Sequence, residues 1–308
     1  MISRRSVRIK VMQVLYSIET INDESDKKNP VRSLNQLLDN TKELLTYLLY
    51  FIVEVGRYAE TDAAYRASKN LLSSDDLNVN IKLAGNDIVW KIMDNSSYKS
   101  AVEEFRPRLN EEGQELIKKT YHKLIPTPEY KTYIAEEGRS KKSEIAILDF
   151  IFSDLMFTDE QFLDFALENF SSFSNDVEML NKIVTSILHK PQTLNLSEAI
   201  TKETQEYGNT LLKTVLDKKG HLSEIIKPKL RNWDPERIAH IDMILLEMGV
   251  AELLYFETIP PKVTINEYID IAKEYSTEQS GQFVNGILDS IRKDLETSNK
   301  LHKIDFRK

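Results

Sequence analysis

The stretch Val263–Ile291, VTINEYIDIAKEYSTEQSGQFVNGILDSI, decides the fold, because it combines strong helix signals with two residues that helix propensity does not explain. In its first half, Thr264 and Glu267 have the spacing of a capping box, which predicts a helix start directly after the pair Pro260-Pro261. This half therefore predicts one helix, which ends before the polar residues at 276–279.

The second half predicts another helix, with one apolar face at 100° per residue. That face consists of Val284, Ile287, Leu288, Ile291 and Leu295. Phe283 lies at the margin of the face, and Asn285 and Gly286 lie off it. A polar residue and a glycine inside a helix cost stability, so something other than propensity placed them there. Phe283 belongs either to the core or to a contact surface, and its spacing alone leaves both open.

The composition indicates an all-α protein. The chain has 308 residues with only nine glycines and nine prolines, and most long segments show helical periodicity. It has no cysteine, which excludes disulfides and thiolate metal sites. No apolar segment reaches the roughly 20 residues that a membrane span needs. The longest uncharged apolar run, 44–53, predicts a buried helix, and we expect a cytoplasmic protein with no membrane contact.

The charge is distributed unevenly along the chain. The net charge is −8, which argues against a nucleic-acid surface over the whole molecule. Residues 1–20, however, contain Arg4, Arg5, Arg8 and Lys10 against Glu19 alone, a net charge of +3, which leaves −11 for the remaining 288 residues. Any binding of a polyanion would therefore have to be local.

Residues 3–20 predict a helix with two different faces. A core stripe consists of Val7, Val11, Val14, Leu15 and Ile18. A neighbouring ridge consists of Arg5, Arg8, Met12 and Tyr16. A basic ridge that ends in an aromatic ring suits single-stranded RNA, because guanidinium groups bind phosphates and the ring stacks on bases. The alternative is a solvated amphipathic helix with a tyrosine at the edge of the core.

Further helices follow from the apolar periodicity and from cap signals. We expect them over 31–72 (one helix or two, with Gly56 the likeliest kink), 83–93, 101–105, 109–125, 145–157, 160–170 (capped by Asp159), 175–189 (capped by Asn175 or Asp176), 201–230 and from Asp234-Pro235 to just before Pro260. The charged segment 136–143 is the best internal boundary, and residues 297–308 predict a frayed tail.

No pattern of catalytic, cofactor-binding or metal-binding residues is present in the sequence. The five histidines are scattered and never take metal-ligand spacing, and the glycines form neither a dinucleotide-binding nor a phosphate-binding loop. Asp242 and Glu252 lie within an otherwise apolar helix, and we interpret them as structural charges that have partners. We therefore expect a protein that has no cofactor and no metal.

Two sets of residues at opposite ends of the chain carry a family resemblance. The first set is Arg4, Arg5, Arg8, Gln13, Leu15 and Tyr16. The second includes Trp233, Arg237-Ile238, Ile265-Asn266-Glu267, Ala272-Lys273 and Phe283-Val284-Asn285-Gly286-Ile287-Leu288. In these residues the chain resembles the NusB family of bacterial transcription antitermination factors, over about residues 3–20 and 205–295.

The resemblance implies an all-α, NusB-like helical bundle with an inserted helical region, in a protein that is not an enzyme. The bundle would comprise 1–20 and 201–296, the insertion 21–200, and the tail 297–308. NusB-like proteins bind the boxA element of nascent ribosomal RNA together with a small-subunit ribosomal protein, NusE, and join the RNA polymerase antitermination complex. Carried over by position, the RNA contacts implied are Arg4, Arg5, Arg8, Gln13, Tyr16 and Phe283. This surface would need the first helix to pack beside the last.

Two departures from the family pattern bear on these expectations. Gln282 stands where many family members have a basic residue, so one phosphate contact would be missing. The insertion is acidic, which favours a role in protein contacts or packing. A rival hypothesis is a helical protein-interaction scaffold in transcription or ribosome assembly without direct RNA contact. An RNA-modifying enzyme is disfavoured, because the insertion has no glycine-rich cofactor loop.

Overall fold

The computed structural model describes residues 2–21, 28–71, 73, 79–230 and 238–304, and the part it describes is helical without a β-strand. By their internal contacts the residues divide into two compact units. Unit 1 is Asp39–Ile200, and unit 2 combines Ile2–Leu38 with Thr201–Lys308. The expected all-α class is confirmed, and the two ends of the sequence lie in one unit.

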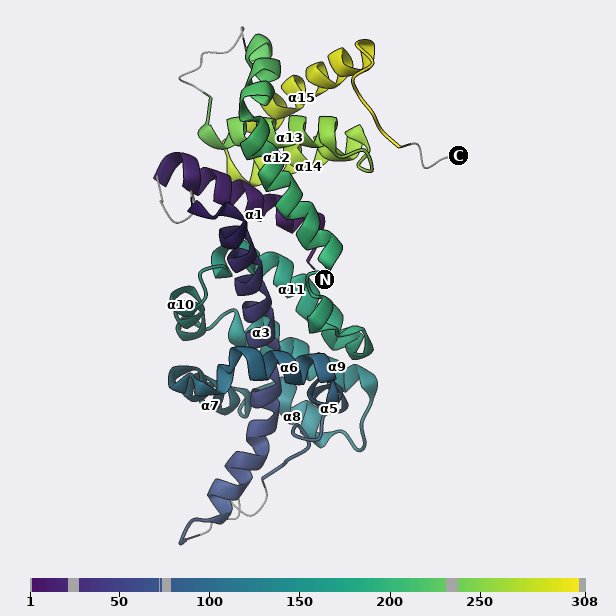
Figure 1. Cartoon of the computed structure of the whole chain (residues 1–308). Coiled ribbons are helices and arrows are strands. Elements are labelled where there is room, and N and C mark those ends of the chain that lie inside the picture. Colours follow the sequence, from purple (N-terminus) through teal and green to yellow (C-terminus); the bar gives the residue numbers. More distant parts are fainter. Residues whose placement is uncertain (1, 22–27, 72, 74–78, 231–237, 305–308) are drawn as a thin grey trace. The chain divides into compact units, whose positions relative to one another are not determined.

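Unit 1 is built around the helix α3, Pro30–Ala67, which contributes its residues from Asp39 onward (Figure 1). Residues 44–53 are all buried, as the apolar run predicted, so other helices surround this part of α3. The helix is continuous through Gly56, where an added Cβ would lie 3.2 Å from Val89 Cγ2. Gly56 therefore provides close packing inside one long helix.

Shorter helices complete unit 1. They are α5 Asp87–Asp94, α6 Ser96–Phe105, α7 Glu111–Leu124, α8 Pro128–Ala135, α9 Lys141–Phe150, α10 Glu160–Asn169 and α11 Phe173–His189. Asp159 caps α10 as expected, because its side chain accepts a hydrogen bond from the Gln161 amide. The cap expected at Asn175 or Asp176 is wrong, since α11 begins at Phe173. Asp176 is instead buried and accepts a hydrogen bond from Thr41 Oγ1 at 2.6 Å.

Unit 2 is built around α13, His240–Tyr255, of which residues 244–253 are all buried. Its other helices are α1 Arg4–Tyr16, α12 Lys202–Ile226, α14 Pro261–Tyr275 and α15 Ser280–Thr297 (Figure 1). α1 packs on α12 and α13, and α15 packs on α13 and α14. α12 is continuous through Gly220 as expected and ends in a 3₁₀ turn, Lys227–Leu230. The start expected at Asp234-Pro235 lies outside the described residues.

Two expectations for unit 2 need correction. α14 begins at Pro261, so Thr264 lies inside the helix and is not its cap. The tail is not frayed over its described part, since Lys303 Nζ donates to the backbone oxygens of Glu252 and Phe256 at 2.9 and 2.7 Å. These bonds add a second donor to two carbonyl groups at the C-terminal end of α13, which also accept from the backbone amides of Phe256 and Ile259.

Candidate nucleic-acid interface

The helix α1 is buried on more sides than its apolar stripe predicts. The predicted stripe residues Val7, Val11, Val14 and Leu15 are at most 1% exposed. Arg8, Lys10 and Met12 are also buried, at 3%, 2% and 3% exposed. α1 is therefore a packed element of unit 2, and only part of its basic ridge reaches solvent.

A buried ion pair joins α1 to the central helix of unit 2. Arg8 donates from Nε to Glu252 Oε1 at 2.7 Å and from one terminal nitrogen to Glu252 Oε2 at 3.1 Å. The Glu252 carboxylate is fully buried, and it also accepts hydrogen bonds from Thr264 Oγ1 and the Tyr268 hydroxyl at 3.0 Å each. The Tyr207 hydroxyl donates to it as well. Donors from α1, α12 and α14 thus converge on one side chain of α13.

The surroundings keep the Arg8 guanidinium charged. Burial by itself would lower the pKa of Arg8, but the hydrogen bond and the negative charge of Glu252 raise it above its usual value. The Arg8 guanidinium also lies 5.4 Å from the ring centre of Tyr207 and 5.8 Å from that of Tyr268. Burial and the nearby Glu252 raise the pKa of both phenols well above 10, so both remain donors.

The expectation that Arg8 contacts RNA phosphate must therefore be corrected. Its guanidinium is 3% exposed and is occupied by Glu252 and, at 3.4 Å, by Glu267. Releasing it to solvent would leave the Glu252 carboxylate buried and without a counter-charge, which costs several kcal/mol. Arg8 fixes the position of α1, and it does not present charge at the surface.

Arg4 and Arg5 remain accessible. The Arg4 side chain is 39% exposed and pairs with Glu203 on α12. The Arg5 side chain is 33% exposed and pairs with Glu274 and Asp270 on α14, at 3.0 and 3.7 Å. Exposed ion pairs of this kind contribute about 0–1 kcal/mol each, so an incoming phosphate can replace the carboxylates.

Tyr16 and Gln13 extend the accessible part of α1. Tyr16 is 37% exposed, and its ring meets the His240 ring edge-on, with 5.9 Å between ring centres. Gln13 is half-buried. At 100° per residue, Arg5, Gln13 and Tyr16 fall within about 80° of the helix circumference, and Arg4 lies about 100° from Arg5, so the four residues span about half of the circumference. We call these four residues the α1 surface.

Phe283 does not share the exposure of the α1 surface. It is 5% exposed on α15, alongside the apolar residues Val284 and Ile287, so its ring is not available for stacking on a base. The expectation that Phe283 contacts RNA must therefore be corrected. Of the two alternatives, the core position is the one that the burial of Phe283 supports. The residues of α15 that do reach solvent here are Gln282, Asn285 and Gly286.

Sequence reasoning missed the residues that hold α1 in place. Glu252 was recognisable as a charge inside an apolar helix, but nothing in the spacing pointed to Arg8 as its partner. Tyr207 and Tyr268 gave no signal, because a hydroxyl at the edge of an apolar stripe occurs in many helices, and Thr264 was assigned to a helix cap. Among the described residues, no group of histidines and carboxylates is placed to hold a metal ion. No described helix is long and apolar enough to cross a membrane.

Comparison with known proteins agrees with the architecture of unit 2. The model of the NusB family matches residues 165–293, which include α12 to α14 and most of α15. The match begins within unit 1, so its boundary differs from that of the contact-defined units. α1 lies outside the matched residues in sequence, but it packs directly on α12 and α13, which are matched.

Individual relatives match about a third of the chain. The "Transcription antitermination protein NusB" of Salinibacter ruber is 45% identical over 100 residues, 32% of this chain and 62% of that protein. The protein of the same name from Methylacidiphilum infernorum is 49% identical over 95 residues, 31% of this chain and 66% of that protein. The chain thus spans less than two thirds of the length of these relatives.

A solved structure, that of T. maritima NusB, is 36% identical and is matched over 35% of this chain and 74% of its own, with a TM-score of 0.30. The sequence matches agree on the family. Residues 165–293 of this chain therefore form a NusB family domain.

Proposed function

We propose that this protein is a transcription antitermination factor that binds boxA-like single-stranded RNA in nascent ribosomal RNA through the α1 surface. The observation that carries the proposal is the packing of α1 on the family-matched helices, with Arg5 and Tyr16 left accessible on one side. Guanidinium groups and an exposed aromatic ring are the groups that bind single strands.

Arg4 and Arg5 supply the charge for phosphates, Tyr16 offers a ring for a base, and Gln13 offers an amide between them. Two phosphate contacts to a single strand correspond to a slope of log K against log salt of about −1.4. Two phosphate contacts give only a modest affinity for RNA, which fits a protein that binds RNA together with a partner. By resemblance to the NusB family, that partner is a NusE-like small-subunit ribosomal protein, and the assembly includes RNA polymerase.

The test is RNA binding by the full chain, measured by fluorescence anisotropy with a boxA-like RNA and with a permuted RNA of the same composition. Each RNA is titrated with and without the NusE-like protein. We expect tighter binding of the boxA-like RNA, strengthened by the partner. Equal affinity for both RNAs in every condition would contradict the proposal.

The second candidate function is a protein-interaction scaffold without direct RNA contact. It is favoured by the acidic charge of unit 1 and by the carboxylates that already pair with Arg4 and Arg5. In the same titration, a chain that binds the ribosomal protein but never binds RNA, alone or in the complex, would support this function.

A further inference from the structure

The net negative charge of the molecule lies entirely in unit 1. Residues 39–200 contain 27 acidic and 18 basic side chains, a net charge of −9. The rest of the chain contains 22 acidic and 23 basic side chains, a net charge of +1. A unit of this charge repels nucleic acid and attracts basic proteins.

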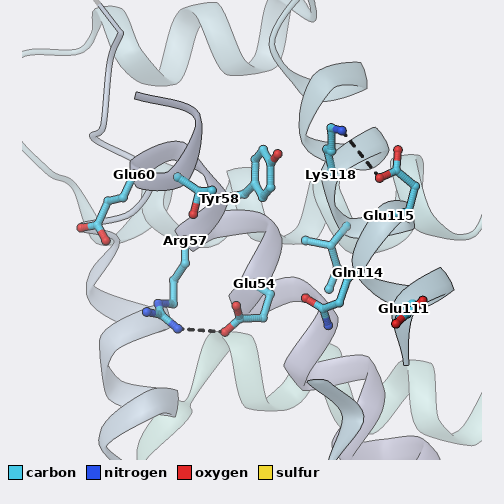
Figure 2. Close-up of a pocket in the computed structure, with 10 residues that line it drawn as sticks. Glu54, Arg57, Tyr58, Glu60, Glu111, Gln114, Glu115 and Lys118 are labelled. Carbon is cyan, nitrogen blue, oxygen red and sulfur yellow. Dashed lines mark hydrogen bonds and ion pairs between the residues drawn. The ribbon is translucent and has the colours of Figure 1, made fainter. Parts of the chain in front are cut away.

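A groove between α3 and α7 concentrates this charge (Figure 2). It has a volume of about 440 Å³. Its charged lining residues are Glu54, Arg57 and Glu60 of α3 and Glu111, Glu115 and Lys118 of α7. The lining thus holds four carboxylates against two cationic groups, so its net charge is −2.

The two cationic groups are already neutralised within the groove, as the dashed lines in Figure 2 show. Arg57 pairs with Glu54 at 3.0 Å, and Lys118 pairs with Glu115 at 3.6 Å. Within the described part of the chain, Glu60 on α3 and Glu111 on α7 have no ion pair. Two carboxylates from different helices are therefore left for a partner.

The other lining residues fit a side chain better than a bare ion. The Tyr58 ring forms part of the wall, and Gln114 is held by a hydrogen bond to the Tyr50 hydroxyl at 3.0 Å. An aromatic ring beside carboxylates suits a guanidinium or ammonium group on an alkyl chain. A divalent cation is not favoured, because no group of three possible ligands is close enough among the described residues.

We propose that this groove is a docking site for a basic, arginine- or lysine-containing segment of a partner protein. Two cationic side chains of the segment pair with Glu60 and Glu111, and one of them packs on Tyr58. The site lies in unit 1, so it is independent of the RNA binding proposed for the α1 surface.

The test uses the full chain and a labelled short peptide of alternating arginine and glycine, with binding followed by fluorescence anisotropy. The groove variant is Glu60→Gln/Glu111→Gln. The matched control is Glu137→Gln/Glu168→Gln, which removes the same charge from exposed positions of unit 1 that do not line the groove. Thermal melts establish that both variants remain folded.

We expect the groove variant to bind the peptide about 5-fold more weakly, the effect of losing two exposed ion pairs of ordinary strength. The control variant should change the affinity by less than about 2-fold. Equal losses in both variants, or no binding by the unmodified chain, would overturn the proposal. If the groove variant altered the affinity for a single-stranded RNA probe instead, the class of partner would be wrong.

Discussion

Arg8 and Glu252 are 244 residues apart in the sequence and form a buried, doubly hydrogen-bonded ion pair. The pair ties the first helix to the central helix of unit 2, across the whole of unit 1 in sequence. Its geometry, with a planar guanidinium against both oxygens of one carboxylate, is the strongest form of charge-assisted hydrogen bonding. The position of the α1 surface therefore depends on this contact.

Replacing Arg8 with Met should destabilise unit 2 by about 3–5 kcal/mol, because Glu252 would remain buried without its counter-charge. Urea unfolding followed by circular dichroism measures the loss. The double variant Arg8→Met/Glu252→Leu should be less destabilised than the sum of the two single variants, since it removes both charges together.

Arg292→Ala is the matched control for the ion-pair experiment. Arg292 also pairs with two carboxylates, Asp289 and Glu296, but at the surface of α15. Its loss should cost less than about 1 kcal/mol. A cost below about 1 kcal/mol for Arg8→Met as well would show that the buried pair does not hold α1.

Gly208 and Gly220 should respond in opposite directions to alanine. Both lie in α12, but a Cβ on Gly208 would overlap Val7 of α1, whereas a Cβ on Gly220 would meet nothing within 4 Å. Gly208→Ala should lower the melting temperature, because α1 must shift. Gly220→Ala should raise stability by about 0.5–1 kcal/mol through helix propensity. Stabilisation by both substitutions would contradict the close packing of α1 on α12.

Glu247 makes the stability of unit 2 dependent on pH. Its pKa is raised from 4.5 to about 7, mainly by burial. The positive charge of Lys219 opposes this rise, and the negative charge of Glu19 adds to it. A carboxyl that binds its proton more tightly in the folded state stabilises that state at low pH. This contribution is fully present below about pH 4.5 and is lost as the pH rises to about 7.

Glu247→Gln cannot ionise, so it should be more stable than the unmodified chain at pH 8, by about 3 kcal/mol at most. The difference should shrink toward pH 5. Thermal melts across this range provide the measurement, and Glu224→Gln, at an exposed position of α12, is the control that should show no such trend. A stability difference that is the same at every pH would exclude this role of Glu247.

The sequence predicts the class of the fold because helical periodicity is local. The buried run 44–53 and the stripe from Val7 to Leu15 follow directly from side-chain spacing. The burial of Arg8 could not be predicted from spacing, since Arg5 and Arg8 lie on the same ridge. Only the second is buried, and that depends on a carboxylate far away in the sequence.

Phe283 and Thr264 illustrate two other limits of sequence reasoning. For Phe283, periodicity left the core position open, and the family resemblance shifted the expectation toward a contact surface, which the packing of α15 contradicts. For Thr264, a local cap motif was present, but Pro261 starts the helix earlier and the hydroxyl bonds to Glu252. The Thr264 side chain thus bonds to Glu252 of another helix, and it does not cap its own helix.

Tyr16 should contribute to RNA affinity through its ring. Tyr16→Ala should weaken binding of boxA-like RNA by about 1–3 kcal/mol for one stacked base, without changing the salt dependence. Tyr16→Phe retains the ring and should bind nearly as well as the unmodified chain. Equal losses in the two variants would indicate that the hydroxyl group, and not stacking, makes the contact.

The most direct test of the account is the salt dependence of RNA binding by an Arg5 variant. The unmodified chain should give a slope of log K against log salt of about −1.4, and Arg5→Gln, which removes one phosphate contact, about −0.7. Arg292→Gln, with the same loss of charge on α15, should keep the slope of the unmodified chain. A slope that is unchanged in Arg5→Gln, or reduced equally in both variants, would contradict RNA binding through the α1 surface.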